Sequence, residues 1–152
     1  MQLSRNFTLA QLTHSDTAEA RGIDNEPPPE VIENLRRLAA GLEQVQSRLG
    51  HAIEISSGYR CAQLNAAIGG SSGSQHVQGL AADFCCPGFG TPIDIARDLV
   101  DSGIDFDQVI LEFARWVHIS FGAPPRGRVL TIYDSAQGYL AGLRDRDGNI
   151  LA

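Results

Sequence analysis

A long amphipathic segment from Glu30 to Leu49 places the strongest constraint on how this chain can fold. Its apolar residues recur at the three- and four-residue spacing of one helical face, and Gly50 supplies a natural stop. That face consists of Val31, Leu35, Leu38, Leu42, Val45 and Leu49. Because Arg36, Arg37 and Glu43 fall opposite, the segment predicts a helix that packs on a core along one side. A partner-binding helix is the alternative, but the apolar stripe is no wider than packing requires.

Shorter elements surround this helix in an irregular order. Thr8 and Gln11 form the pattern of a capping box that opens a short helix, and Thr91 opens another that ends near Gly103. A further helix is expected over 61–68, and the segment 20–29, with its three prolines, predicts a loop. Strands are expected at 52–56, 81–84, 108–113, 116–121 and 129–133. This order predicts an α+β fold, with a small antiparallel sheet flanked by helices.

The composition fits one compact domain that spans residues 1–152. Hydrophobic residues make up 43% of the chain and charged residues 20%, which is enough for a core. The formal net charge of −6 provides no basic stripe to neutralise phosphates, so nucleic acid is not an expected partner. The N-terminus lacks the apolar run of a signal peptide, and no segment is suited to cross a bilayer. We therefore expect a monomer that is synthesised in the cytoplasm without membrane insertion.

The three cysteines, Cys61, Cys85 and Cys86, form no CxxC pair. An odd total leaves at least one thiol unpaired within the chain. All three are expected to be small buried or half-buried residues. A metal-free hydrolase that uses Cys61 as its nucleophile is the alternative, and inhibition by a thiol alkylator instead of a chelator would distinguish it.

Two histidines and one aspartate are the first candidates for a metal site. His76 and Asp83 lie seven residues apart in a stretch rich in small residues, and His118 lies in a later apolar strand. Imidazole nitrogen and carboxylate oxygen both bind zinc, and catalytic zinc typically has three protein ligands and one open position. His14 and His51 are peripheral. From these residues alone a second interpretation stays open, because a histidine in an apolar strand is more often a core residue than a ligand.

A set of motifs resembles one known family. The motifs are Ser56-Ser57-Gly58-Tyr59-Arg60, Ser74-x-His76-x-x-Gly79-x-Ala81-x-Asp83 and Trp116-Val117-His118. Together they resemble the zinc D-alanyl-D-alanine carboxypeptidases, whose relatives include D-Ala-D-Ala dipeptidases and L-alanyl-D-glutamate endolysins. The resemblance runs from about Phe7 to Phe121. It is especially close to the compact phage and prophage endolysin-like branch, which shares the opening at 6–9 and the segment 106–121.

The resemblance implies a role for individual residues. His76, Asp83 and His118 match the family's zinc ligands, and Arg60 matches its substrate-binding arginine. A guanidinium group can hold a carboxylate in a bidentate pair or stabilise a developing oxyanion, so Arg60 is also assigned a catalytic role. Ser74 and Trp116 are assigned to the substrate-binding groove.

The general base departs from the family pattern. Relatives place an acidic residue three positions before the last zinc histidine, where this chain has Arg115. The nearest carboxylate is Glu112, and a glutamate in an apolar strand is costly to bury without a partner. We assign Glu112 as the base that activates water at the zinc, with Asp107 as the fallback, although strand parity alone does not decide which face Glu112 occupies.

These assignments predict a zinc peptidase that cleaves peptide bonds of the bacterial peptidoglycan stem peptide or cross-link. The expected context is phage or prophage lysis or a tail function, in which the protein reaches the wall after holin release or as a virion component. The alternative is a non-catalytic peptidoglycan-binding protein that retains the fold, and Arg115 is its best argument. D-Ala-D-Ala, a D,D cross-link and L-Ala-D-Glu all stay open as the bond that is cut.

Overall fold

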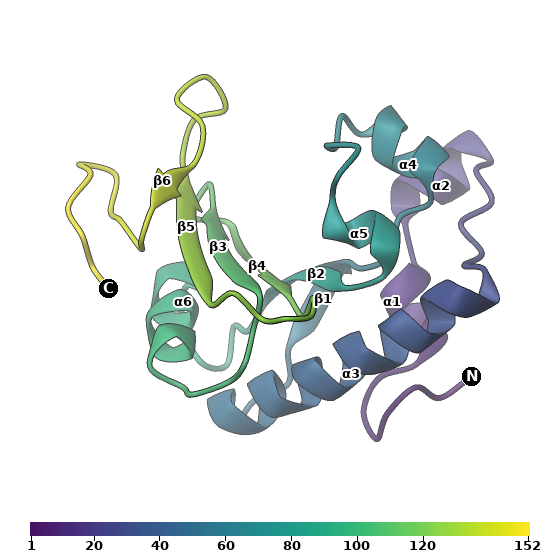
Figure 1. Ribbon diagram of the computed structural model, residues 1–152, viewed down its shortest axis with the longest axis horizontal. Coiled ribbons are helices and arrows are strands. Elements are labelled where there is room, and N and C mark those ends of the chain that lie inside the picture. The colour runs from purple at the N-terminus through teal and green to yellow at the C-terminus, as the bar shows by residue number, and fades with distance from the viewer.

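A computed structural model describes all 152 residues and is organised around one six-stranded sheet (Figure 1). The strand order is β1-β2-β4-β3-β5-β6. The strands are β1 (Glu54–Ser57), β2 (Ala81–Cys85), β3 (Gln108–Glu112), β4 (Trp116–Ser120), β5 (Arg128–Ile132) and β6 (Leu140–Ala141). An α+β fold is thereby confirmed.

The expectation of an antiparallel sheet was wrong at one place. β3 and β5 pair in parallel, whereas every other neighbouring pair is antiparallel, so the sheet is mixed. The connection between β4 and β5 passes the start of β3, where the backbone N–H groups of Gly127 and Arg128 donate to Phe106 and Asp107, and β5 then lies beside β3 instead of beside β4. The sequence pattern also missed β6, which is only two residues long.

The helix α3 (Pro29–Leu49) confirms the most constrained prediction. Pro29 occupies the first turn, and Gly50 ends the helix in a left-handed conformation at φ 70°, where its N–H donates to Gln46. The face that packs on the sheet includes Gly41, where an added Cβ would lie 2.4 Å from the Phe121 ring. The helix and Phe121, the residue that follows β4, therefore approach each other more closely than a side chain on Gly41 would allow.

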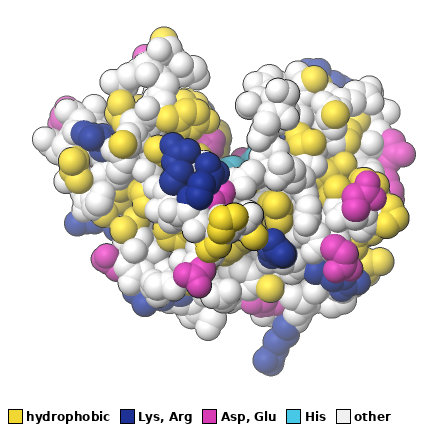
Figure 2. Space-filling model, in the orientation of Figure 1, with side chains coloured by type: hydrophobic (Ala, Val, Ile, Leu, Met, Phe, Trp, Pro, Cys, Tyr) yellow, Lys and Arg dark blue, Asp and Glu magenta, His cyan; other side chains and the backbone are white.

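One face of the sheet packs on the core, and the other lines a cleft. Val109, Leu111, Val117 and Ile119 point toward the buried core, which α3 and α6 (Pro92–Val100) complete. Their sequence neighbours point to the opposite face, because side chains alternate along a strand. That opposite face is the wall of an open cleft, visible in Figure 2 between two lobes of the molecule.

The other wall of the cleft contains Arg60, the loop that follows α4 (Ala62–Ala67) and residues of α5 (Gln75–Gln78). Two more short helices, α1 (Leu9–Thr13) and α2 (Asp16–Arg21), precede α3 and do not line the cleft. The capping boxes of α1 and α6 are confirmed, with both reciprocal hydrogen bonds present at Thr8 and at Thr91. The helix α2 was not predicted, although Ser15 caps it and Gly22 ends it, so the expected loop begins only after Arg21.

No helix of the structure combines the length and the apolar character that crossing a membrane would require. All three cysteines are free thiols, with Cys86 buried and Cys61 and Cys85 half-buried. The Cys61 thiol caps α4 by accepting from the backbone N–H of Leu64 at 3.4 Å, and it forms no hydrogen bond to a histidine.

Candidate metal centre and active site

His76, Asp83 and His118 meet on the floor of the cleft. Nδ1 of His118 lies 3.0 Å from Oδ1 of Asp83, and Nε2 of His76 lies 3.3 Å from the same oxygen. The three residues are only 2%, 6% and 8% exposed, and their ligand atoms all lie within 4.8 Å of one another. They form a compact group that could hold a metal ion.

Strand register places two of the three residues. Asp83 on β2 stands directly opposite His118 on β4, and paired residues on neighbouring strands present their side chains on the same face. His76 comes from α5, which Ser74 caps by accepting from the His76 backbone N–H at 3.2 Å. Gly79 ends α5 at φ 75°, and an added Cβ there would lie 2.8 Å from a methyl group of Val31. Only glycine fits a left-handed turn this close to α3, and the turn leads the chain directly into β2.

One hydrogen bond fixes the orientation of the His76 ring. Nδ1 of His76 lies 2.7 Å from the carbonyl oxygen of Gly58, and a carbonyl oxygen only accepts, so Nδ1 carries the proton. In the neutral ring Nε2 then has a free lone pair, and this buried atom has no hydrogen-bond partner. A lone pair that faces a carboxylate oxygen at 3.3 Å fits a site for a cation between them.

The charge state of Asp83 suits a metal ligand. Burial opposes ionisation of its carboxyl group, but the two neighbouring imidazoles, His118 at 3.0 Å and His76 at 3.3 Å, outweigh burial and hold its pKa well below the usual range. The carboxylate is therefore ionised at neutral pH and available to a cation.

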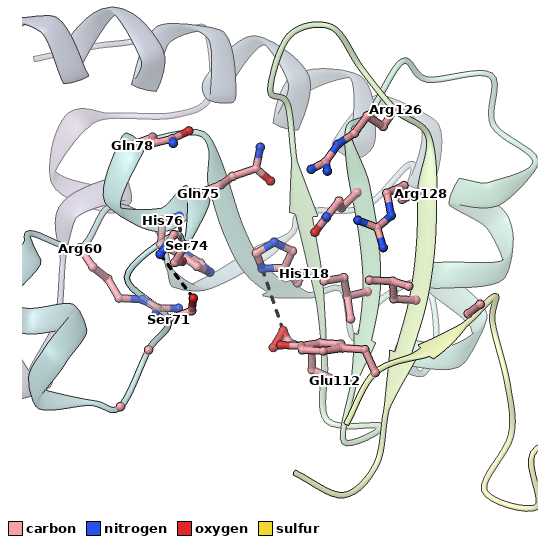
Figure 3. A pocket seen from close by; sticks show the side chains of 18 residues that line it. Arg60, Ser71, Ser74, Gln75, His76, Gln78, Glu112, His118, Arg126 and Arg128 are labelled. Atoms are coloured by element: carbon pink, nitrogen blue, oxygen red, sulfur yellow. Dashed lines mark hydrogen bonds and ion pairs between the residues drawn. The ribbon is translucent and has the colours of Figure 1, made fainter. Parts of the chain in front are cut away.

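Glu112 lies on the same face of the sheet as His118. In the β3–β4 pairing Ile110 stands opposite His118 and Glu112 stands opposite Trp116. Because residues two apart on a strand share a face, this register shows which face of the sheet Glu112 occupies, a question that the sequence left open. Oε2 of Glu112 lies 4.0 Å from Nδ1 of His118. A dashed line in Figure 3 marks this contact. Burial, and then the negative charge of Asp83, raise the pKa of Glu112 to about 7.

The turn beside Glu112 departs from ordinary backbone geometry. Phe113 and Ala114 have φ values of 55° and 53°, a region that L residues other than asparagine and aspartate seldom occupy. Two successive left-handed residues make the tight connection that Glu112 needs at the end of β3, directly before β4 begins at Trp116.

Arg60 approaches Asp83 from the wall of the cleft opposite the sheet. Its Nη2 lies 3.7 Å from Oδ2 of Asp83, while its other nitrogens donate to Ser57 at 3.2 Å and to Asn65 at 3.0 Å. Gly70 makes this possible, because an added Cβ would lie 2.1 Å from Oδ1 of Asn65 and 2.9 Å from Nη1 of Arg60. Two hydrogen bonds to neutral partners thus hold a charged side chain in a fixed orientation at the edge of the cleft.

Asp107 has a different environment from Glu112. Its carboxylate is 2% exposed and accepts from Nε and Nη2 of Arg126 at 2.8 Å each, from the Arg126 backbone and from Gln75. The hydrogen bonds from Arg126 are the main reason that its pKa falls to about 2, which makes it a poor proton acceptor. Asp107 joins the loop before β5 to α5, the helix that carries His76.

The cleft itself has a volume of about 910 Å³ and is lined mainly by polar side chains. His76, His118, Glu112, Arg60 and Ser74 all line it. Trp116 instead lines a separate hollow with Phe113 and Tyr133, so its assignment to substrate binding stays a prediction. Figure 2 shows the cyan of a histidine at the bottom of the cleft and dark-blue cationic groups on its rim.

Sequence reasoning missed the groups that support this site. The carbonyl group of Gly58 gives no sequence signal, because every residue has one. Asn65, Gln75 and Arg126 are ordinary polar residues in helices and loops, and only their contacts reveal a role. Arg128 was also overlooked, although it directly precedes an expected strand.

Three buried groups that could hold a metal ion lie beside the Glu112 carboxylate in an open cleft, and this arrangement suits a metal-dependent hydrolase. The family model of Peptidase M15 matches residues 5–120, and the chain belongs to this family. Membership in this family makes the chain a peptidase, and M15 peptidases are generally zinc-dependent. The resemblance found in the sequence is thus confirmed at the level of the family, while the phage endolysin-like branch stays a prediction. A comparison with curated proteins found no matching sequence.

Proposed function

We propose that this chain is a zinc peptidase that hydrolyses peptide bonds in the stem peptide or the cross-link of bacterial peptidoglycan. The observation that carries the proposal is the unpartnered Nε2 of His76, which is buried 3.3 Å from Oδ1 of Asp83. Two groups that both accept protons or cations are costly to bury face to face unless a cation lies between them. Membership in Peptidase M15 supports zinc as that cation and a peptide as the substrate.

His76, Asp83 and His118 would hold the zinc ion. Two neutral imidazoles and one carboxylate leave such a site with a net charge of about one positive unit. When bound, zinc supplies Lewis-acid chemistry, in which water is acidified and a carbonyl group is polarised. The hydrogen bond from His76 to Gly58 keeps one ligand nitrogen directed at the site.

Glu112 would move the proton. Its carboxylate lies at the edge of the metal group, 4.0 Å from the His118 ring, and it faces the cleft. In this position it would take a proton from the attacking water and deliver it to the nitrogen of the leaving amine. Arg115, at the position where relatives have an acidic residue, is exposed and cannot accept a proton.

Arg60 would bind the substrate on the other side of the metal group. Its guanidinium group is held by Ser57 and Asn65, so little side-chain entropy is lost when it pairs with a substrate oxygen. It can hold a peptide carboxylate or stabilise the oxyanion that forms at the scissile carbonyl. Ser74 lines the same cleft next to His76 and would contact the bound peptide.

The proposed setting is phage or prophage lysis, or a virion tail that acts on the cell wall. The support for it is the resemblance of the segments 6–9 and 106–121 to the compact phage branch. The protein would reach its substrate through a holin or as part of the particle.

Digestion of purified peptidoglycan by the zinc-loaded protein, followed by mass analysis of the fragments, tests the proposal. We expect new stem-peptide fragments whose masses identify the cut bond, and we expect a chelator, not a thiol alkylator, to stop the reaction. Sensitivity to the alkylator alone would favour Cys61 chemistry. Binding to peptidoglycan without any new fragment would favour the non-catalytic alternative.

A further inference from the structure

The wall of the cleft formed by β5 carries a cationic group that the proposed reaction does not use. Arg128 begins β5 and stands opposite Gln108 on β3, while Leu130 stands opposite Ile110, which in turn faces His118. Residues two apart on a strand share a face, so Arg128 projects from the same face of the sheet as His118. Arg128 lines the cleft, and Figure 3 shows its side chain on the wall across from Arg60.

Arg128 has no partner within the protein. It is exposed, and its side chain takes part in no ion pair and donates no hydrogen bond. Its neighbour Arg126 is different, because its Nε and Nη2 both donate to Asp107 at 2.8 Å. Arg126 therefore belongs to the scaffold of the cleft, while the five N–H donors of Arg128 are free for a ligand.

One cationic group that lines the cleft has no acidic neighbour. Three arginines line the cleft, but Arg126 pairs with Asp107 and Arg60 lies 3.7 Å from Asp83, so Arg128 alone among them forms no ion pair. Field lines concentrate in a cleft, so this unpaired charge attracts anionic groups even to a protein with a formal net charge of −6. Arg60 and Arg128 stand on opposite walls, with His76 and His118 between them (Figure 3).

From this geometry we infer that Arg128 is a specificity-determining residue that binds a carboxylate of the substrate. The inference rests on the proposed peptidase function and deepens it, because it names the substrate class. The substrate is an acidic peptide whose carboxylate lies on the β5 side of the cleaved bond, away from Arg60. The guanidinium group of Arg128 forms a bidentate pair with that carboxylate, and the neighbouring Gln108 amide supplies a further donor.

Pairs of synthetic peptides that differ by one acidic residue and its amide, glutamate against glutamine, test the inference. The acidic residue is placed on either side of the cleaved bond, and kcat/KM is measured for each peptide. The ratio of interest is kcat/KM for the acidic peptide divided by kcat/KM for its amide. With the acidic residue on the β5 side of the cleaved bond, we expect this ratio to be about 10 to 100 in the wild type, as one charge-assisted pair provides. With the acidic residue on the other side, we expect a smaller ratio. In Arg128→Gln the ratio should fall close to one, and in Arg128→Lys it should be intermediate, since lysine keeps the charge without the planar pair of donors.

Arg37→Gln is the matched control. Arg37 is exposed on α3, forms no ion pair and does not line the cleft, and its replacement changes the net charge by the same amount. We expect the control to keep the wild-type ratio, and we expect added salt to lower that ratio in wild type and control alike. A wild type that does not distinguish the acid from the amide would overturn the inference, as would an Arg128→Gln ratio equal to that of the wild type.

A binding measurement separates this inference from the proposed function. If the zinc-loaded wild type cleaves no peptide, the peptidase proposal fails. Calorimetric titration of the same acid and amide peptides then decides the role of Arg128. Tighter binding of the acid that disappears in Arg128→Gln supports the role, and equal binding of both peptides refutes it.

Discussion

The carbonyl oxygen of Gly58 lies 2.7 Å from Nδ1 of His76, and the backbone N–H of Arg60 donates to the carbonyl oxygen of His76 at 3.1 Å. The turn after β1 and the helix α5 therefore hold each other through two hydrogen bonds. One of the bonds orients His76, a proposed metal ligand, and the other anchors Arg60, the proposed substrate-binding residue. Small displacements of the turn would consequently disturb metal binding and substrate binding together.

Removal of a metal ligand should abolish metal binding. We expect the wild type to bind one zinc ion per chain in native mass spectrometry, and we expect His76→Ala and His118→Ala to bind none at the same free zinc concentration. His14→Ala is the control, because His14 lies in a fully exposed group with Asp16 and Glu19. Loss of the single zinc ion in His14→Ala, with retention in His76→Ala, would move the metal site to the surface group.

Replacement of the proposed base should slow the reaction without loss of zinc. In Glu112→Gln we expect kcat/KM to fall by about 10²- to 10⁴-fold, the usual contribution of a positioned general base. Glu54→Gln provides the control, since Glu54 is an exposed strand residue outside the cleft. Zinc content measured on the same samples separates loss of the base from loss of the metal. A zinc-loaded Glu112→Gln variant with the wild-type rate would exclude Glu112 from the mechanism.

The pH dependence of stability should reveal the Asp107 cluster. The pKa of Asp107 is lowered to about 2 in the folded protein, so the carboxylate stabilises the fold above its unfolded pKa. That contribution is lost as the pH falls through the folded value. We expect Asp107→Asn to lower the free energy of unfolding by about 1–3 kcal/mol at pH 7, because its partners Arg126 and Gln75 lose a charged acceptor.

Urea denaturation at pH 7, 4 and 3 measures this effect. The difference between the wild type and Asp107→Asn should shrink as the pH falls below 4, whereas Asp105→Asn, at an exposed position nearby, should differ little at any pH. A difference that stays constant down to pH 3 would show that the lost stability comes from packing, not from the charge of Asp107.

Close packing between α3 and the end of β4 should make Gly41 sensitive to a single methyl group. Glycine to alanine inside a helix normally stabilises it, but here the added Cβ would lie 2.4 Å from the Phe121 ring. We expect Gly41→Ala to lower the free energy of unfolding by about 1–3 kcal/mol, the usual cost of overpacking. In a double-mutant cycle, Phe121→Leu should recover part of this loss by making room. Purely additive effects would mean that the ring moves aside freely.

Much of the local structure could be predicted from the sequence because its causes are local. Periodicity and a glycine stop define α3, and reciprocal capping residues define the starts of α1 and α6. The grouping of His76, Asp83 and His118 could be predicted as well, but only through the resemblance to a known family. Spacing alone left His118 open as a core residue.

Long-range pairing accounts for the remainder. No local pattern states that β5 aligns in parallel with β3, and this alignment is what brings Arg128 to the cleft wall. The face that Glu112 occupies depends on its register with Trp116, since a shift of one residue would turn it into the core. The free lone pair of His76 depends on a carbonyl group 18 residues away in the chain. Helices and turns follow from neighbouring residues, whereas the chemistry of the cleft arises from contacts between distant ones that form only when the whole sheet is assembled.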